Sequence, residues 1–176
     1  MRVFLNGVVF TLAILFAAVL AGVYLGVMPA AADSKPPALE KWAANTSLHA
    51  TLARETPSLS NRLQPTDANL ADGLTSYGQN CAVCHGSSDG KPSKLTQGFY
   101  IGAPQLAKDG VEDDPEAVSY WKIAHGIRFT AMPSFKGTLS DDEMWKLAMF
   151  LRHMDKLPPA VDAQWKRLPS ASAATP

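Results

Sequence analysis

Cys81-Ala82-Val83-Cys84-His85 contains both cysteines of this 176-residue chain, and a histidine directly follows the second one. This C-x-x-C-H spacing is the sequence to which haem is attached through two thioether bonds, with the histidine as an axial ligand of the iron. Two intervening residues let one backbone turn present both sulfurs to one edge of the haem and aim the imidazole at the iron. The motif therefore predicts one covalent haem c, held by Cys81 and Cys84 and ligated by His85.

Two other chemistries use closely spaced cysteines, and the rest of the chain argues against both. A structural zinc site usually takes four ligands from two separated pairs, whereas His49, His125 and His153 are scattered along the chain. A thioredoxin-like redox centre needs a βαβ pattern around the motif, and no β-rich run surrounds it here. Haem attachment is the interpretation that remains.

The first 32 residues contain a long apolar block. Residues 3–28 include no charged side chain, and Arg2 precedes them. A positive flank stays in the cytoplasm, so residues 33–176 are expected to be exported. The block is longer than the core of a signal peptide, about 7–15 residues, and long enough for a spanning helix, about 18 or more, although Ala30-Ala31-Ala32 offers a cleavage site. We therefore expect an anchor in a bacterial inner membrane with the haem domain in the periplasm; cleavage would instead give a soluble periplasmic protein.

The second axial ligand of the iron is expected from a loop. Met132 precedes Pro133, which disfavours helix for the residue before it and favours an extended loop that can lie across a haem face. Three other methionines fall in the helical stretch near the C-terminus, where methionine commonly fills core space. His125, before Gly126, is the alternative, but a histidine that ends a helix is commonly a capping or surface residue. Met132 is the preferred ligand.

The chain divides into four segments. Residues 1–32 are a signal-anchor or signal peptide, and residues 33–66 are a linker arm that is partly helical. Residues 67–157 are the haem domain, and residues 158–176 are a tail rich in proline, alanine and serine. The tail is expected to be mobile, with Trp165 as the residue able to hold part of it against the domain.

Helix boundaries inside the haem domain follow from capping residues. A first helix is expected after Asp67 as its N-cap, and a middle helix from Pro115, at its first position, to Gly126. The last helix opens at Ser140, which forms a capping box with Glu143. The domain is therefore expected to be helical.

The order of helix, C-x-x-C-H, loop, middle helices, Met-Pro loop and terminal helix resembles a class I cytochrome c over residues 67–157. The resemblance implies an all-α fold of about three to five helices wrapped around one covalent haem. It also implies that Gly73 and Tyr77 of the first helix interlock with Phe150 of the last. Residues 120–156, with the sequences AHGIR and MPSF, are also similar to membrane-linked bacterial cytochromes.

The resemblance further implies which residues surround the haem. Pro104 and Leu106 match the family's Pro-x-Leu, in which the proline carbonyl binds the second nitrogen of the axial histidine and the leucine lines the haem. A bond of this kind to His85 would fix its ring and tune the iron. Leu147 and Leu151 match leucines of the haem cavity.

With His85 and Met132 on the iron, no open position remains for a substrate, so single-electron transfer between membrane redox complexes is expected and catalysis is not. The alternative is a fixed haem c subunit of a membrane dehydrogenase or terminal oxidase. The expected partners are donor and acceptor redox proteins and, through the N-terminal helix, the membrane. No small-molecule substrate is expected, and a formal net charge of zero gives no attraction to nucleic acid.

Four basic side chains near the motif or the methionine loop are expected to surround the exposed haem edge: Lys91, Lys94, Arg128 and Lys136.

Overall fold

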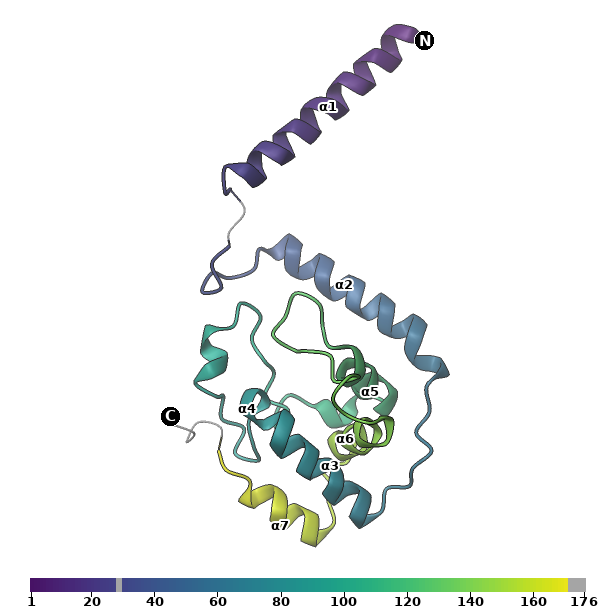
Figure 1. Cartoon of the computed structure of the whole chain (residues 1–176), viewed down its shortest axis with the longest axis vertical. Coiled ribbons are helices and arrows are strands. Elements are labelled where there is room, and N and C mark those ends of the chain that lie inside the picture. Colours follow the sequence, from purple (N-terminus) through teal and green to yellow (C-terminus); the bar gives the residue numbers. More distant parts are fainter. Residues whose placement is uncertain (28–29, 171–176) are drawn as a thin grey trace. The chain divides into compact units, whose positions relative to one another are not determined.

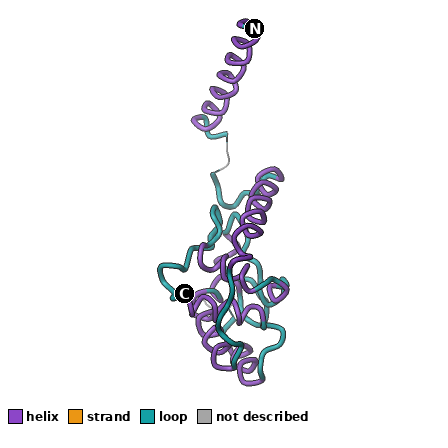
Figure 2. The backbone as a smooth tube through the Cα atoms, turned by 90° about the vertical axis from the view of Figure 1, so that its right-hand side faces the viewer, coloured by secondary structure: helices purple, strands orange, loops and turns teal. Residues whose placement is uncertain are grey.

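The computed structural model describes residues 1–27 and 30–170, and that part of the chain contains helices and loops but no strand (Figure 1 and Figure 2). The chain forms two compact units, Met1–Ser34 and Lys35–Pro176. The prediction of an all-α fold is confirmed. The helices are α1 (Arg2–Tyr24), α2 (Ala38–Glu55), η1 (Thr56–Ser58), α3 (Asp67–Asn80), α4 (Ala82–His85), η2 (Leu95–Gly98), η3 (Val111–Asp113), α5 (Glu116–His125), α6 (Asp141–Arg152) and α7 (Pro159–Arg167), with η marking 3-10 turns.

The first unit is dominated by α1, an uninterrupted apolar helix of 23 residues. At 1.5 Å per residue it is about 35 Å long, enough to cross a hydrocarbon core of about 30 Å. A core helix of a soluble domain would bury its apolar side chains, but α1 buries none. Its length and composition suit a membrane span or a signal segment near the N-terminus. Residue 28, the end of the predicted apolar block, lies outside the described residues.

The core of the second unit lies where α3 packs against α6. Gly73 permits this approach, because a Cβ there would lie 2.9 Å from the Cβ of Phe150 and would overlap the carbonyl of Lys146. Tyr77 and Phe150 are fully buried, with ring centroids 5.5 Å apart. The predicted interlock of the first and last helices of the domain is present.

Capping residues start the helices of the domain close to the predicted positions. Ser140 and Glu143 form the predicted capping box of α6: the Glu143 N–H donates to Ser140 Oγ at 3.3 Å, and the Ser140 N–H donates to Glu143 Oε2 at 2.8 Å. The N-cap of α3 is Thr66 rather than Asp67; Asp67 instead occupies the first turn, where a carboxylate is favoured by the helix dipole. Pro115 likewise caps α5 instead of opening its first turn.

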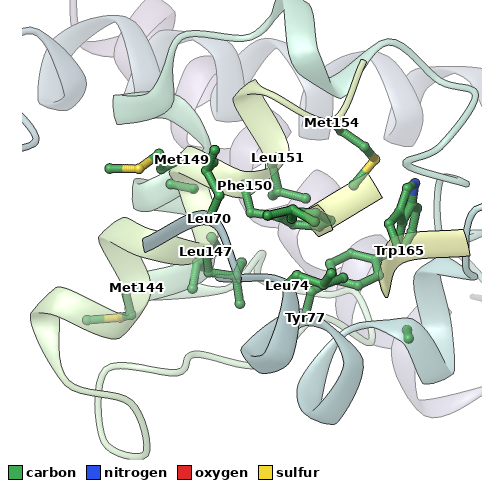
Figure 3. Packing of buried hydrophobic residues seen from close by; sticks show 14 of the residues in the cluster. Leu70, Leu74, Tyr77, Met144, Leu147, Met149, Phe150, Leu151, Met154 and Trp165 are labelled. Carbon is green, nitrogen blue, oxygen red and sulfur yellow. The ribbon is translucent and has the colours of Figure 1, made fainter. Parts of the chain in front are cut away.

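Residues 159–167 form a helix where the composition predicted an irregular tail. Val161 and Trp165, one turn apart on α7, are buried. The Trp165 ring packs edge-on against Tyr77 and Phe150, with centroids 5.3 and 5.5 Å away (Figure 3). α7 therefore adds a third element to the α3 and α6 core, and the last part of the predicted tail, residues 171–176, lies outside the described residues.

The predicted helix in the linker arm is present as α2, and it packs on the domain. Leu52 is buried. The Trp121 indole N–H of α5 donates to Glu55 Oε2 at 2.9 Å, and the Tyr100 hydroxyl donates to Glu40 Oε2 at 2.8 Å. The arm thus belongs to the same compact unit as the predicted haem domain.

Candidate haem site

The C-x-x-C-H motif lies on one tight helical turn that follows α3. Cys81 is the C-cap of α3 and the N-cap of α4, and its carbonyl accepts hydrogen bonds from the N–H groups of Cys84 at 3.0 Å and His85 at 2.8 Å. Both cysteines and the histidine therefore lie on one short helical turn. Gly86 ends it with φ of +77°, and a Cβ there would lie 2.6 Å from Gln105 Oε1 and 2.9 Å from the Lys91 carbonyl. The turn therefore requires glycine at position 86.

The ring of His85 is oriented by a residue 19 positions away. Its Nδ1–H donates to the carbonyl of Pro104 at 2.9 Å, a partner that only accepts and so assigns the proton to Nδ1. Burial lowers the pKa of His85, against a smaller opposing effect of the hydrogen bond to Pro104. The imidazole is therefore neutral at neutral pH, with Nε2 left as the nitrogen that can bind iron.

The two thiols are unpaired and protonated. Neither cysteine is in a disulfide. Burial, helped by the neighbouring Cys84, raises the pKa of Cys81 to about 12, and burial raises the pKa of Cys84 as well. A redox-active thiol pair depends on a lowered pKa, so this environment does not suit one. Within residues 1–27 and 30–170, no three His, Cys, Asp or Glu side chains gather into a metal-binding cluster, which leaves zinc without a ligand set.

Met132 lies in a loop that folds back on the end of α5. Gly126, with φ of +66°, touches this loop so closely that a Cβ would lie 2.7 Å from the Met132 carbonyl. The Ile127 N–H donates to that carbonyl at 3.2 Å, and the Met132 N–H donates to Thr130 Oγ1 at 3.1 Å. Ser134 Oγ, two residues further on, donates to the Ala124 carbonyl at 2.6 Å. These bonds hold Met132, whose side chain is half-buried, in a defined position.

His125, the alternative ligand, is exposed on the last turn of α5. Its ring lies against Trp121 with centroids 4.8 Å apart, and the indole of Trp121 is bonded to Glu55 of α2. The ring of His125 therefore packs on Trp121, which is bonded to α2, whereas the backbone of Met132 is held by hydrogen bonds within its own loop.

The leucines implied by the resemblance differ in their surroundings. Leu147 and Leu151 of α6 are 1% and 5% exposed and belong to the central core (Figure 3). Leu106 is half-buried and packs against that core. The structure therefore places all three at or within the apolar interior that adjoins the motif.

Two contacts that support the motif were not predicted from the sequence, although Trp165 itself was expected to hold part of the tail against the domain. The Tyr77 hydroxyl donates to the Gly86 carbonyl at 2.8 Å, which joins the α3 core to the turn after His85, and burial raises the pKa of Tyr77. Trp165 covers Tyr77 from α7. The spacing of Val161 and Trp165 is the sequence signal that could have revealed this helix.

These groups fit a covalently bound haem. Two unpaired thiols and a neutral imidazole share one turn, the carbonyl of Pro104 holds the imidazole, and apolar side chains adjoin them. Iron in c-type haem is ligated by such a histidine, with methionine as the usual second ligand. The donor set therefore suits haem c better than zinc or a dithiol redox centre.

The chain is similar to known proteins over this part. The family model described as cytochrome C oxidase, cbb3-type, subunit III matches residues 68–151. Cytochrome c6 of Leptolyngbya boryana is 33% identical over 88 residues, which cover 48% of this chain and 91% of that protein. No solved structure gives a significant match. With the motif, the interlocked helices and a match along nearly the whole length of a cytochrome, the chain belongs to the class I c-type cytochromes.

Proposed function

We propose that the protein is an anchored one-electron carrier, with a single haem c attached to Cys81 and Cys84, ligated by His85 and Met132, at the periplasmic face of a bacterial inner membrane. Family membership carries the coarser part of this statement: a covalently bound haem c that exchanges electrons with protein partners. The finer part rests mainly on His85, whose Nδ1 is bonded to the Pro104 carbonyl at 2.9 Å, so that Nε2 remains for iron.

Each residue of the site has a separate task in this function. The haem, when bound, supplies a reversible one-electron couple. Cys81 and Cys84 keep it attached through every redox cycle. Pro104 holds the His85 ring in one orientation, as the partners of metal-bound histidines do. The Met132 loop and the buried Leu147 and Leu151 would shield a bound haem from water, which would favour its reduced form and raise its potential.

Two protein ligands also explain why this site suits electron transfer better than catalysis. His85 and Met132 would together supply both protein ligands of the iron, so that no ligand position would remain for a substrate. A haem held in this way would supply electron exchange with proteins that dock transiently.

The test uses the full-length protein produced in a host competent for haem attachment. The denatured protein is expected to carry the mass of one haem, the redox titration to follow a one-electron curve, and the reduced protein to leave carbon monoxide unbound at neutral pH. Carbon monoxide binding by the unmodified protein would show an open iron position and contradict the carrier.

The match to a family model named for an oxidase subunit favours a second candidate, a fixed haem c subunit of a membrane dehydrogenase or oxidase. Gentle detergent extraction of native membranes separates the two. A carrier is recovered apart from larger complexes, whereas a fixed subunit is recovered in constant proportion to its partners.

A further inference from the structure

We infer that the N-terminal end of α2 is a membrane-contact surface, with Leu39 and Trp42 seated in the headgroup region of the bilayer. The inference rests on the proposed retention of α1 as an anchor. It assigns a role to a part of the chain that lies outside the residues shared with the cytochrome family model.

One side of α2 packs against the rest of the domain. Glu40, near its start, accepts the hydroxyl of Tyr100 at 2.8 Å, and Glu55, at its end, accepts the indole N–H of Trp121 at 2.9 Å. Leu52 is buried between these two ends. Because successive residues are about 100° apart around a helix, Glu40 and Glu55 share one side. These contacts fix the rotation of α2 about its own axis.

The opposite side of α2 faces away from the domain and is uncharged. Leu39 is 73% exposed and Trp42 is 64% exposed. Trp42 differs from the other tryptophans, since Trp145 and Trp165 are buried and Trp121 is half-buried with its N–H bonded. The same side of the helix continues with small or neutral residues and contains no Asp, Glu, Lys or Arg: Ala43, Thr46, His49, Ala50 and Ala53.

If α1 spans the membrane, the short segment that follows it keeps the start of α2 close to the bilayer surface. Residues 25–37, thirteen in number, join α1 to α2, and such a segment spans at most about 45 Å when extended. Leu39 and Trp42 lie at the end of α2 nearest to this tether in sequence. Tryptophan is enriched at membrane interfaces, where its apolar ring and polar N–H are both satisfied.

Charge does not account for this contact. Asp33 and Glu40 balance Lys35 and Lys41 at the start of the helix. Apolar burial is then the driving force, and the contact is expected to be as strong on zwitterionic lipid as on anionic lipid. The domain would then be attached to the membrane at two places, by α1 and by the start of α2. Two attachments restrict the rotation of the haem domain relative to the membrane.

The experiment uses the full-length holoprotein in phosphatidylcholine vesicles, with and without lipids brominated high on the acyl chains. Tryptophan emission in brominated vesicles is divided by emission in unbrominated ones, so that quenching by the haem cancels. We expect the wild type to lose emission to bromine, and we expect Trp42→Phe to lose this quenching. Trp121→Phe, which changes an inward-facing tryptophan, is the matched control and should retain it. Phosphatidylglycerol at three parts in ten should leave the ratio unchanged.

Failure of the contact and failure of the anchor have different signatures. If mass analysis shows an intact N-terminus and the protein floats with vesicles, but bromine quenches neither wild type nor control, the contact by α2 is overturned while the anchor stands. Quenching that persists in Trp42→Phe also overturns it. A protein cleaved near residue 32 that stays in solution overturns the anchor itself.

Discussion

The two thiols of the motif are protonated, since burial raises the pKa of Cys81 to about 12 and also raises that of Cys84. They are therefore weak nucleophiles at neutral pH. The proposed attachment of haem to Cys81 and Cys84 gives this cysteine pair a role other than the disulfide that is usual in an exported protein.

Replacing either cysteine tests this assignment. Cys81→Ala or Cys84→Ala removes one of two covalent links, so stable holoprotein should be lost, as measured by haem staining of denaturing gels and by mass. Val83→Ala is the control, because Val83 lies between the cysteines with its side chain 52% exposed and should leave the yield intact. A normal yield of stained protein from both cysteine variants would contradict the attachment.

The sixth ligand is tested by Met132→Ala. If Met132 binds the iron, the variant loses the weak sulfur-to-iron absorption at the red end of the oxidised spectrum, has a lower potential and binds carbon monoxide when reduced. Met144→Leu and Met149→Leu should keep that absorption, because both side chains are buried in α6 and leucine preserves most of their volume. An unchanged spectrum in Met132→Ala together with a changed one in His125→Ala would assign the site to His125.

Among the helices, α7 is the element whose contribution to stability is most easily measured. Trp165 is 5% exposed and packs on two rings of the α3 and α6 core. Trp165→Ala should lower the free energy of unfolding of the holoprotein by about 3–5 kcal/mol, the usual cost of removing a buried aromatic side chain. Denaturant unfolding followed by circular dichroism provides the measurement.

The matched control for that experiment is Trp42→Ala. Trp42 is exposed on α2, so its removal should change the free energy of unfolding in detergent by no more than about 0.5 kcal/mol. Equal effects of the two substitutions would mean that α7 does not pack on the core in solution.

For the molecule as a whole, topology sets which compartment the haem faces. Arg2 is the only charged side chain before the apolar residues of α1, which predicts that everything after α1 is exported. A reporter active only outside the cytoplasm should therefore work when fused after residue 176. A fusion after Lys156 would be less suitable, because it would remove α7 and its buried Trp165. Activity of a cytoplasm-specific reporter at the same position would contradict the topology.

Partner docking is the second property of the whole molecule. Lys136 is exposed in the loop that carries Met132 and is expected to lie near the exposed haem edge. Lys136→Glu should change the rate of reduction by a partner, and the salt dependence of that rate, more than Lys166→Glu does. Lys166 lies on α7 in an exposed pair with Asp162, so its variant makes the same change of charge in a different element. Equal effects on stopped-flow rates would remove the basis for a docking site around Met132.

Much of this protein is specified by short-range patterns. Each of these patterns depends on residues that follow closely in the sequence: the spacing of Cys81, Cys84 and His85, the capping box of Ser140 and Glu143, and the uncharged run of residues 3–24. Such patterns act through local backbone geometry, so they can be recognised before any fold is known.

Contacts between distant segments could not be predicted in the same way. Trp165 contacts Tyr77 across 88 positions, Glu40 binds Tyr100 across 60, and the partner of His85 was anticipated through family resemblance and not through spacing. Tail composition suggested mobility, yet burial against α3 and α6 orders α7, because an apolar pair such as Val161 and Trp165 gains its free energy only when the rest of the fold supplies a surface. Local sequence therefore determined the chemistry of the haem site, while the packing of remote helices decided which of its neighbours hold it in place.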